Sequence, residues 1–232
     1  MRQGDIWITD ELIAERYVMP FIESNMYVIR GKKELMIIDP SVDEDLFKSI
    51  PNEPLERITV LLTHEHIDHI SGVNRLRNLF TQTIVVCSSC CAEGIQDPAK
   101  NLAKYWDILF GDRNKQTKNE VREILEKDYI CWSDKIFEDE LEISFESHSL
   151  KLIWAPGHSQ GGMLIFVDDA AVFTGDNLVE GNGVICRFPG GNKKAYMEKT
   201  YPKISELSDN ILILPGHGKP GKLKDMRQFL RF

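Results

Sequence analysis

The chain has 232 residues, of which 42% are hydrophobic and 28% charged, and this is enough apolar material for the core of one globular domain spanning residues 1–232. Its formal net charge of −8 argues against nucleic-acid binding, which depends on attraction to the phosphate backbone. No apolar run approaches the roughly 18 to 20 residues of a membrane span, so we expect a protein that binds neither nucleic acid nor a membrane.

The beginning of the sequence and its cysteines indicate the compartment. Residues 1–17 carry charges throughout and contain no apolar segment of the kind found in secretory signals. The cysteines number five, and an odd count argues against a disulfide framework. Cys87, Cys90 and Cys91 lie in the run CSSCC, but no second pair follows at zinc-site spacing, so we expect reduced thiols without an assigned role. These features favour the cytoplasm and leave the oligomeric state open.

The first half of the chain has the pattern of strands followed by helices. Gly31-Lys32-Lys33 predicts a hairpin turn, and apolar residues at Ile70, Val73 and Leu76 predict a helix by their spacing. Residues 97–128 are expected to form a helical insertion, broken near Gly111-Asp112. Short β-rich runs predict strands at 6–9, 24–30, 34–39, 58–62 and 83–87.

The second half repeats this style. A helix is expected over 195–207, and Asp168-Asp169 predicts a turn between two strands. The predicted strands are 150–155, 163–167, 171–174 and 211–214. Because strands and helices occur in both halves, the sequence predicts an α/β (α+β) protein with two sheets sandwiched between helices.

Three of the six histidines fall in one hexapeptide that directly follows a predicted strand, His64-Glu65-His66-Ile67-Asp68-His69. Alternate residues of an extended segment share one side, so His64 and His66 can converge on one ion. Asp68 and His69 come as the next helix begins, and can turn toward a second ion. Imidazole and carboxylate ligands suit zinc, iron or manganese better than calcium or magnesium. The alternative is a histidine-rich surface loop.

Three further residues follow predicted strands in the same way. His158, Asp176 and His217 each lie just past a strand, on a short loop whose glycine allows a tight turn. Side chains at strand ends can meet at one rim of a sheet pair. Any one of them alone is more often structural, but together with the hexapeptide they indicate a metal site.

These residues resemble the signature of the metallo-β-lactamase-fold hydrolase superfamily over essentially the whole chain. The HxHxDH motif is matched by His64 to His69, and the later single His, Asp and His by His158, Asp176 and His217. The resemblance implies an αββα sandwich of two mixed sheets flanked by helices, with the metals at one edge. It further implies a first ion on His64, His66 and His158, a second on Asp68, His69 and His217, and Asp176 bridging both.

An early aspartate of the family, which closes a strand and braces the metal loop, is matched by Asp39 in MIIDP. A turn-forming aspartate before Pro40 is the competing interpretation.

The segment 175–192, GDNLVEGNGVICRFPGGN, is similar to the glyoxalase II-like branch, although Asn177 stands where Thr or Ser is common. The bridging Asp176 makes antibiotic hydrolysis less favoured, and His66 stands where flavodiiron oxidoreductases carry Glu. The helical tail that binds glutathione in glyoxalase II has no counterpart after His217, so glutathione thioesters are not the favoured substrate.

The resulting hypothesis is hydrolysis of an ester-type bond of a small-molecule substrate, most favourably a thioester, by a hydroxide that bridges two divalent ions. Zinc is expected, with iron or manganese as alternatives. Asp68 and Asp176 would fix the ions and the hydroxide, and pass a proton to the leaving group. The competing functions are lactone or phosphoester hydrolysis, a mononuclear-iron persulfide dioxygenase, and a regulatory ligand-binding protein with a vestigial site.

Substrate contacts are expected from two places. Tyr105, Trp106 and Phe110 in the helical insertion could form an apolar wall above the metals, although an aromatic stripe of this kind is more often core packing. Arg187 could orient an anionic group. His148 is expected to have no catalytic role.

Overall fold

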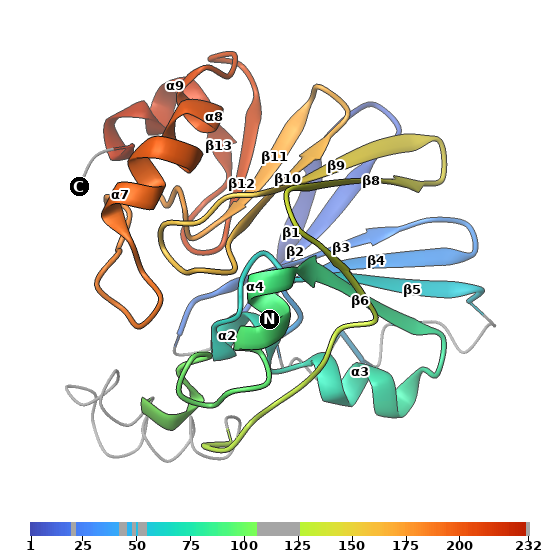
Figure 1. Cartoon of the computed structure of the whole chain (residues 1–232). Coiled ribbons are helices and arrows are strands. Elements are labelled where there is room, and N and C mark those ends of the chain that lie inside the picture. Colours follow the sequence, from blue (N-terminus) through green and yellow to red (C-terminus); the bar gives the residue numbers. More distant parts are fainter. Residues whose placement is uncertain (20–21, 42–45, 48–49, 51–54, 106–125, 231–232) are drawn as a thin grey trace.

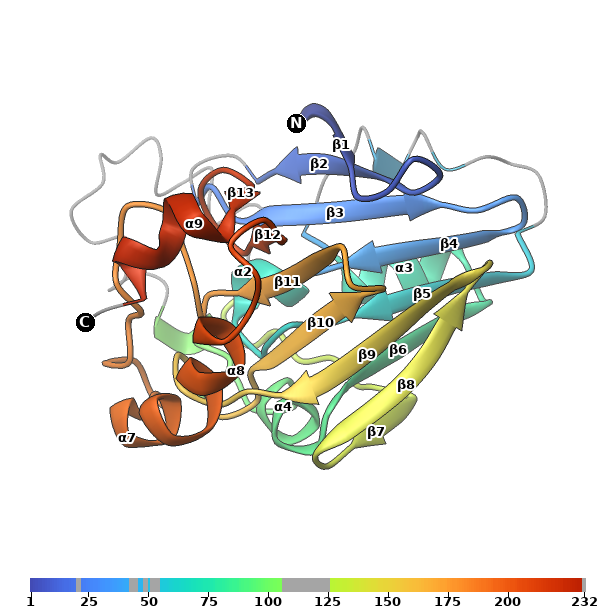
Figure 2. The same ribbon diagram turned by 90° about the horizontal axis from the view of Figure 1, so that it is seen from above.

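The computed structural model describes residues 1–19, 22–41, 46–47, 50, 55–105 and 126–230. Two β-sheets pack face to face, and helices cover their outer faces (Figures 1 and 2). The α/β class and the αββα arrangement predicted from the sequence are therefore confirmed. No helix in the described part of the chain is long and apolar enough to cross a membrane.

The first sheet is built from the N-terminal half and has seven strands in sequence order. Its first four strands are antiparallel neighbours, and parallel pairing begins between the fourth and fifth. The strands are β1 (Arg2–Trp7), β2 (Ile13–Val18), β3 (Asn25–Arg30), β4 (Glu34–Ile38), β5 (Arg57–Leu61), β6 (Thr83–Ser88) and β7 (Lys135–Phe137). Helices α2 (Ile67–Ile70) and α3 (Val73–Leu79) form the crossover from β5 to β6, and α4 (Ser89–Gly94) follows β6. A 3-10 turn, η1, spans Ala103–Tyr105.

The second sheet has six strands in the order β13-β12-β11-β10-β9-β8. Only β11 and β12 pair in parallel, and the other pairs are antiparallel. The strands are β8 (Glu140–Phe145), β9 (His148–Trp154), β10 (Met163–Val167), β11 (Ala171–Gly175), β12 (Leu212–Pro215) and β13 (Gly221–Lys222). Three short helical segments connect β11 to β12, namely α7 (Lys193–Ala195), the π-helical η2 (Tyr196–Thr200) and α8 (Tyr201–Ser205); α9 (Leu223–Met226) and η3 (Arg227–Phe229) follow β13.

Burial on both faces of the central strands explains their uninterrupted apolar sequences. In β4, Leu35 and Ile37 pack toward the helices on the outer face, whereas Met36 and Ile38 pack between the sheets. Parallel strands covered on both sides read as continuous apolar runs for this reason. Between the sheets, Tyr27 of β3 meets Phe173 of β11 edge to face, with ring centroids 5.1 Å apart.

The predicted elements hold best where the chain is buried. The strand predicted at 6–9 lies earlier, as β1 over Arg2–Trp7, because Thr9 accepts hydrogen bonds from the backbone N–H groups of Glu11 and Leu12 and closes a turn there. Strands β2, β7 and β8 were not predicted, since charged residues interrupt their apolar pattern. The helix predicted over 195–207 is three consecutive helical segments over 193–205. Within the predicted insertion, residues 106–125 lie outside the described residues.

Candidate metal centre

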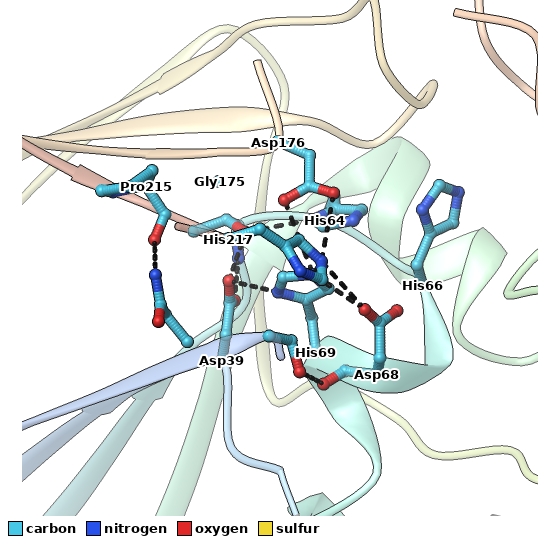
Figure 3. A network of polar contacts seen from close by, with 12 residues as sticks. Asp39, His64, His66, Asp68, His69, Gly175, Asp176, Pro215 and His217 are labelled. Atoms are coloured by element: carbon cyan, nitrogen blue, oxygen red, sulfur yellow. Dashed lines mark hydrogen bonds and ion pairs between the residues drawn. The ribbon is translucent and has the colours of Figure 1, made fainter. Parts of the chain in front are cut away.

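One edge of the sandwich collects the loops that follow five strands, β4 and β5 from the first sheet and β9, β11 and β12 from the second. Because these strands end at the same edge, residues far apart in the sequence meet there (Figure 3). The side chains brought together are Asp39, His64, His66, Asp68, His69, His158, Asp176 and His217.

A first group consists of three buried histidines, His64, His66 and His158. One ring nitrogen from each lies within 4.8 Å of the others. Nε2 of His158 is 3.0 Å from Nδ1 of His66. The Nε2 atoms of His64 and His66 are buried and have no hydrogen-bond partner among the described residues. Buried polar atoms are almost always paired, so an orphaned nitrogen on His64, whose ring lies next to those of His66 and His158, fits a bound cation.

A second group consists of Asp68, His69 and His217. Nε2 of His69 lies 3.3 Å from Nε2 of His217, and both nitrogens face Oδ2 of Asp68, at 3.3 Å and 3.2 Å respectively. The carboxylate supplies a hard oxygen beside two imidazole nitrogens. This donor set suits a divalent transition metal better than calcium, which takes oxygen ligands.

Asp176 lies between the two groups. Its Oδ2 is 3.4 Å from Nε2 of His158 in the first group and 3.6 Å from Nε2 of His217 in the second. Its Oδ1 is buried and has no hydrogen-bond partner among the described residues. A Cβ on Gly216 would clash with this Oδ1 and approach Cε1 of His69 to 2.9 Å, so the glycine before His217 leaves room for the shared carboxylate.

Asp39 supports the second group from behind. Its Oδ2 is 3.0 Å from Nδ1 of His69, and its Oδ1 accepts a hydrogen bond of 2.6 Å from the backbone N–H of Thr63. Figure 3 shows the imidazole of His69 between the carboxylates of Asp39 and Asp68. Because both of its carboxylate oxygens are engaged, Asp39 orients His69 and turns the opposite ring nitrogen toward the site.

The loop that carries His217 is held by the first sheet. Asn25 of β3, which is 1% exposed, donates from Nδ2 to the carbonyls of Pro215 and Gly218 at 2.8 Å and 2.9 Å. Its backbone N–H donates to the carbonyl of Gly216 at 2.6 Å. Arg16 donates from Nε to Oδ1 of Asn25 and from Nη2 to the carbonyl of Gly218. This group of contacts, the Asn25 clamp, fixes a ligand loop of one sheet to a strand of the other.

The loop that carries His158 is held by Asn177 and Glu65. Asn177 accepts a hydrogen bond from the backbone N–H of His158 through Oδ1 and donates to the carbonyl of Ala155. Glu65 is 3% exposed, and its carboxylate accepts hydrogen bonds from the Ser159 hydroxyl and the Gly161 N–H. No role was predicted for Glu65. The only sign of one in the sequence is its position between the candidate ligands His64 and His66.

In the metal-free protein, the histidines of the first group have lowered pKa values and those of the second group have raised ones. Burial lowers the pKa of His64, His66 and His158, that of His66 to about 3, so these rings are neutral and free to bind a cation. Burial alone would also lower the pKa of His69 and His217, but neighbouring carboxylates raise both, that of His69 well above its usual value.

A pocket of about 600 Å³ opens onto the metal-binding side chains. Its floor includes His66, Asp68, His158, Asp176 and His217. Its remaining lining is mainly apolar, with two glutamates, and consists of Ile22, Glu23, Ile67, Leu102, Val179, Glu180, Asn182, Gly183, Ile185, Phe188 and Gly218. A concave apolar pocket with a few converging polar groups is the usual form of a small-molecule site.

Of the four residues expected to contact substrate, the structure describes two, and neither of them lines the pocket. Arg187 is exposed and is not part of the pocket lining, because Phe188 beside it turns inward instead. Tyr105 is partly buried and is also absent from the lining, whereas Leu102 of the same segment contributes to it. Trp106 and Phe110 lie outside the described residues. His148 pairs with Asp168 on the surface and takes no part in the site, as expected.

The chain is similar to known proteins in both sequence and fold. The sequence model of the metallo-β-lactamase superfamily matches residues 19–217. A Bacillus subtilis protein named "Probable metallo-hydrolase YqgX" is 25% identical over 85% of this chain and 86% of its own length. A Haemophilus influenzae protein named "Hydroxyacylglutathione hydrolase GloC" is 27% identical over 87% of this chain and 88% of its own. The crystal structure of TTHA1623 in a di-iron-bound form matches with a TM-score of 0.67 and 21% identity, over 92% of this chain and 97% of that one.

Proposed function

The chain belongs to the metallo-β-lactamase superfamily, and on this premise we propose that it is a hydrolase with two divalent metal ions that cleaves an ester-type bond, most favourably a thioester of a small molecule. The observation that carries the proposal is the position of Asp176. Its carboxylate stands between two complete groups of three ligands, within 3.4 Å of one and 3.6 Å of the other. A single-ion site has no need of the second group.

The geometry supports the following ligand assignment. His64, His66 and His158 would hold the first ion, Asp68, His69 and His217 the second, and Asp176 would contact both. Zinc suits these nitrogen and oxygen donors best, with iron or manganese as alternatives. The relative crystallised with two irons supports a dinuclear centre of this fold and keeps iron among the candidates.

The chemistry divides between the ions and the chain. Bound divalent ions lower the pKa of a coordinated water and polarise a carbonyl oxygen, which supplies the nucleophile and the electrophile of a hydrolysis. Asp68 and Asp176 both line the pocket, where each carboxylate could accept the proton of the attacking water and return it to the leaving group. Asp39 and the Asn25 clamp keep His69 and His217 in place during this exchange.

The substrate class is supported by one relative in particular. A protein named as a hydroxyacylglutathione hydrolase matches this chain over 88% of its own length. A protein with that name can therefore be about as long as this chain. The expectation that glutathione thioesters are disfavoured therefore loses its main support. Thioesters of glutathione belong in the substrate panel beside simple acyl thioesters, lactones, phosphodiesters and β-lactams.

The proposal is tested by assaying the metal-loaded protein on this panel under anaerobic conditions. We expect thiol release from acyl thioesters without oxygen, and loss of that activity in His66→Ala and His217→Ala. His148→Ala is the matched control, because His148 lies on the surface paired with Asp168. A parallel assay in air with a persulfide tests the competing function, and oxygen consumption there without thioester hydrolysis would identify a persulfide dioxygenase. Tight binding of a small molecule without turnover would identify a regulatory protein.

A further inference from the structure

Resting on the proposed function, we infer that the substrate carries an uncharged apolar acyl group, and that Phe188 and Leu102 form the walls that select its length. The inference concerns the part of the pocket beyond the metal-binding side chains. Both residues lie outside the candidate ligand set.

Phe188 stands directly beside the first group of histidines. Its ring centroid is 6.1 Å from that of His66 and 6.0 Å from that of His158, with interplanar angles of 89° and 78°. Edge-on contacts of this kind fix the orientation of an aromatic ring. Phe188 also lines the pocket, so one face of the ring borders the space next to the candidate reaction centre.

The loop that carries Phe188 is anchored to the site. The carbonyl of Ile185 accepts a hydrogen bond of 2.8 Å from Nδ1 of His158, and the carbonyl of Phe188 accepts one of 2.8 Å from the N–H of Gly191. Ile185 and Phe188 both line the pocket. The short segment 185–188 therefore both orients His158 and forms the apolar wall.

The other wall comes from the first sheet's side of the pocket. Ile67 and Leu102 are 3% and 4% exposed, yet both border the pocket. The N–H of Ile67 donates to the carbonyl of Asn101 at 2.8 Å, which holds the two segments together. Leu102 has a φ of 70°, in the left-handed region that a residue with a side chain adopts only when its surroundings enforce it. The Asn101 side chain holds both neighbours of Leu102, because it donates to the carbonyl of Tyr129 and accepts from the N–H of Ala103.

Charge supports the same class of ligand. The only charged side chains in the described lining apart from the metal-binding residues are Glu23 and Glu180. No lysine or arginine of the described residues borders the pocket, so an acyl group ending in a carboxylate or phosphate finds no partner there. An alkyl or aryl group instead displaces water from apolar walls on both sides.

The experiment measures kcat/KM for straight-chain acyl thioesters of one neutral thiol, from acetyl upward, in the metal-loaded wild type. Each added methylene that is fully buried should raise kcat/KM by about fourfold, until the pocket is filled. Phe188→Ala should flatten this dependence, because kcat/KM for long acyl chains should fall more than kcat/KM for acetyl. Phe188→Leu, which keeps an apolar side chain, should restore most of the dependence.

Three controls separate the possible outcomes. Phe229→Ala removes an aromatic ring packed on the outer face of the second sheet and should leave the chain-length dependence unchanged. A series that varies the leaving thiol at constant acyl group shows which end of the substrate meets the wall. Circular dichroism and metal analysis show whether Phe188→Ala is folded and loaded, and Phe188→Leu provides the test if it is not.

Equal rates for all acyl lengths in the wild type, or an equal loss for all lengths in Phe188→Ala, would overturn the acyl wall and leave the hydrolase standing. A dependence on the leaving thiol alone would also overturn it. A metal-loaded wild type that hydrolyses no thioester and no other ester would overturn both the proposed function and this inference.

Discussion

The Asn25 clamp makes a prediction about how the second metal is held. Asn25→Ala removes three side-chain hydrogen bonds, those donated to Pro215 and Gly218 and the one accepted from Arg16. A net hydrogen bond contributes about 0.5 to 1.5 kcal/mol, so we expect the free energy of unfolding to fall by about 2 to 4 kcal/mol. The loss is no larger because both carbonyls keep a partner in Asn25→Ala: Tyr27 still donates to that of Pro215, and Arg16 to that of Gly218.

The same change should act on metal binding at one site and not at the other. A looser His217 loop should lower the affinity for the second ion by about tenfold to a hundredfold, as removal of a supporting contact typically does. His64, His66 and His158 do not touch the clamp, so the first ion should bind as before. Urea unfolding of the metal-free protein measures the first effect, and titration of the metal-free protein with zinc measures the second.

Asn74→Ala is the matched control. Its side chain also donates to a loop carbonyl, that of Ile130, but Asn74 is half-buried on α3 and is not part of the site. We expect at most about 1 kcal/mol of destabilisation and unchanged binding of both ions. Asn25→Asp, which keeps the acceptor for Arg16 but removes the donor, should resemble Asn25→Ala in its metal binding. Equal weakening of both ions, or normal binding of the second ion in Asn25→Ala, would refute the role of the clamp.

Further predictions concern the shared carboxylate, the protons of the second group and the rim of the pocket. Gly216→Ala places a Cβ against Asp176, so metal analysis should show fewer than two ions per chain although the metal-free protein remains folded. The raised pKa values of His69 and His217 mean that protons compete with the second ion up to a higher pH than for an ordinary histidine. Zinc affinity at that site should therefore fall between about pH 8 and about pH 6, as measured by titration at both, while the first ion changes little. Glu180→Gln at the rim should raise kcat/KM for thioesters of anionic thiols by about twofold and leave neutral ones unchanged, because it removes a screened repulsion.

The sequence indicated the candidate ligands because each of their segments follows a buried strand. The hexapeptide His64 to His69 carries four candidate ligands within six residues, directly after β5, and chain topology leaves little freedom in where they point. His158, Asp176 and His217 were found by the same rule, as each follows a strand of the second sheet. Because the strands that precede these residues end at the same edge of the two packed sheets, the residues meet there.

The supporting residues could not be found in this way. Asn25 lies in an ordinary strand, and the carbonyls that it holds are about 190 positions further along the chain. Glu65 looks like a solvent-exposed position between two ligands, and only the fold buries it. Phe188 and Arg187 are neighbours in a loop, and pattern alone does not say which of them turns inward. The single domain over 1–232 with a helical insertion at about 97–128 stays a prediction.

The central claim, that hydrolysis needs both ions, is tested most directly by adding zinc stepwise to metal-free protein and following anaerobic thioester hydrolysis. The account predicts that activity appears mainly with the second equivalent, reaches its maximum at two ions per chain, and is absent at any loading in His217→Ala. Full activity at one ion per chain, retained in His217→Ala, would contradict it.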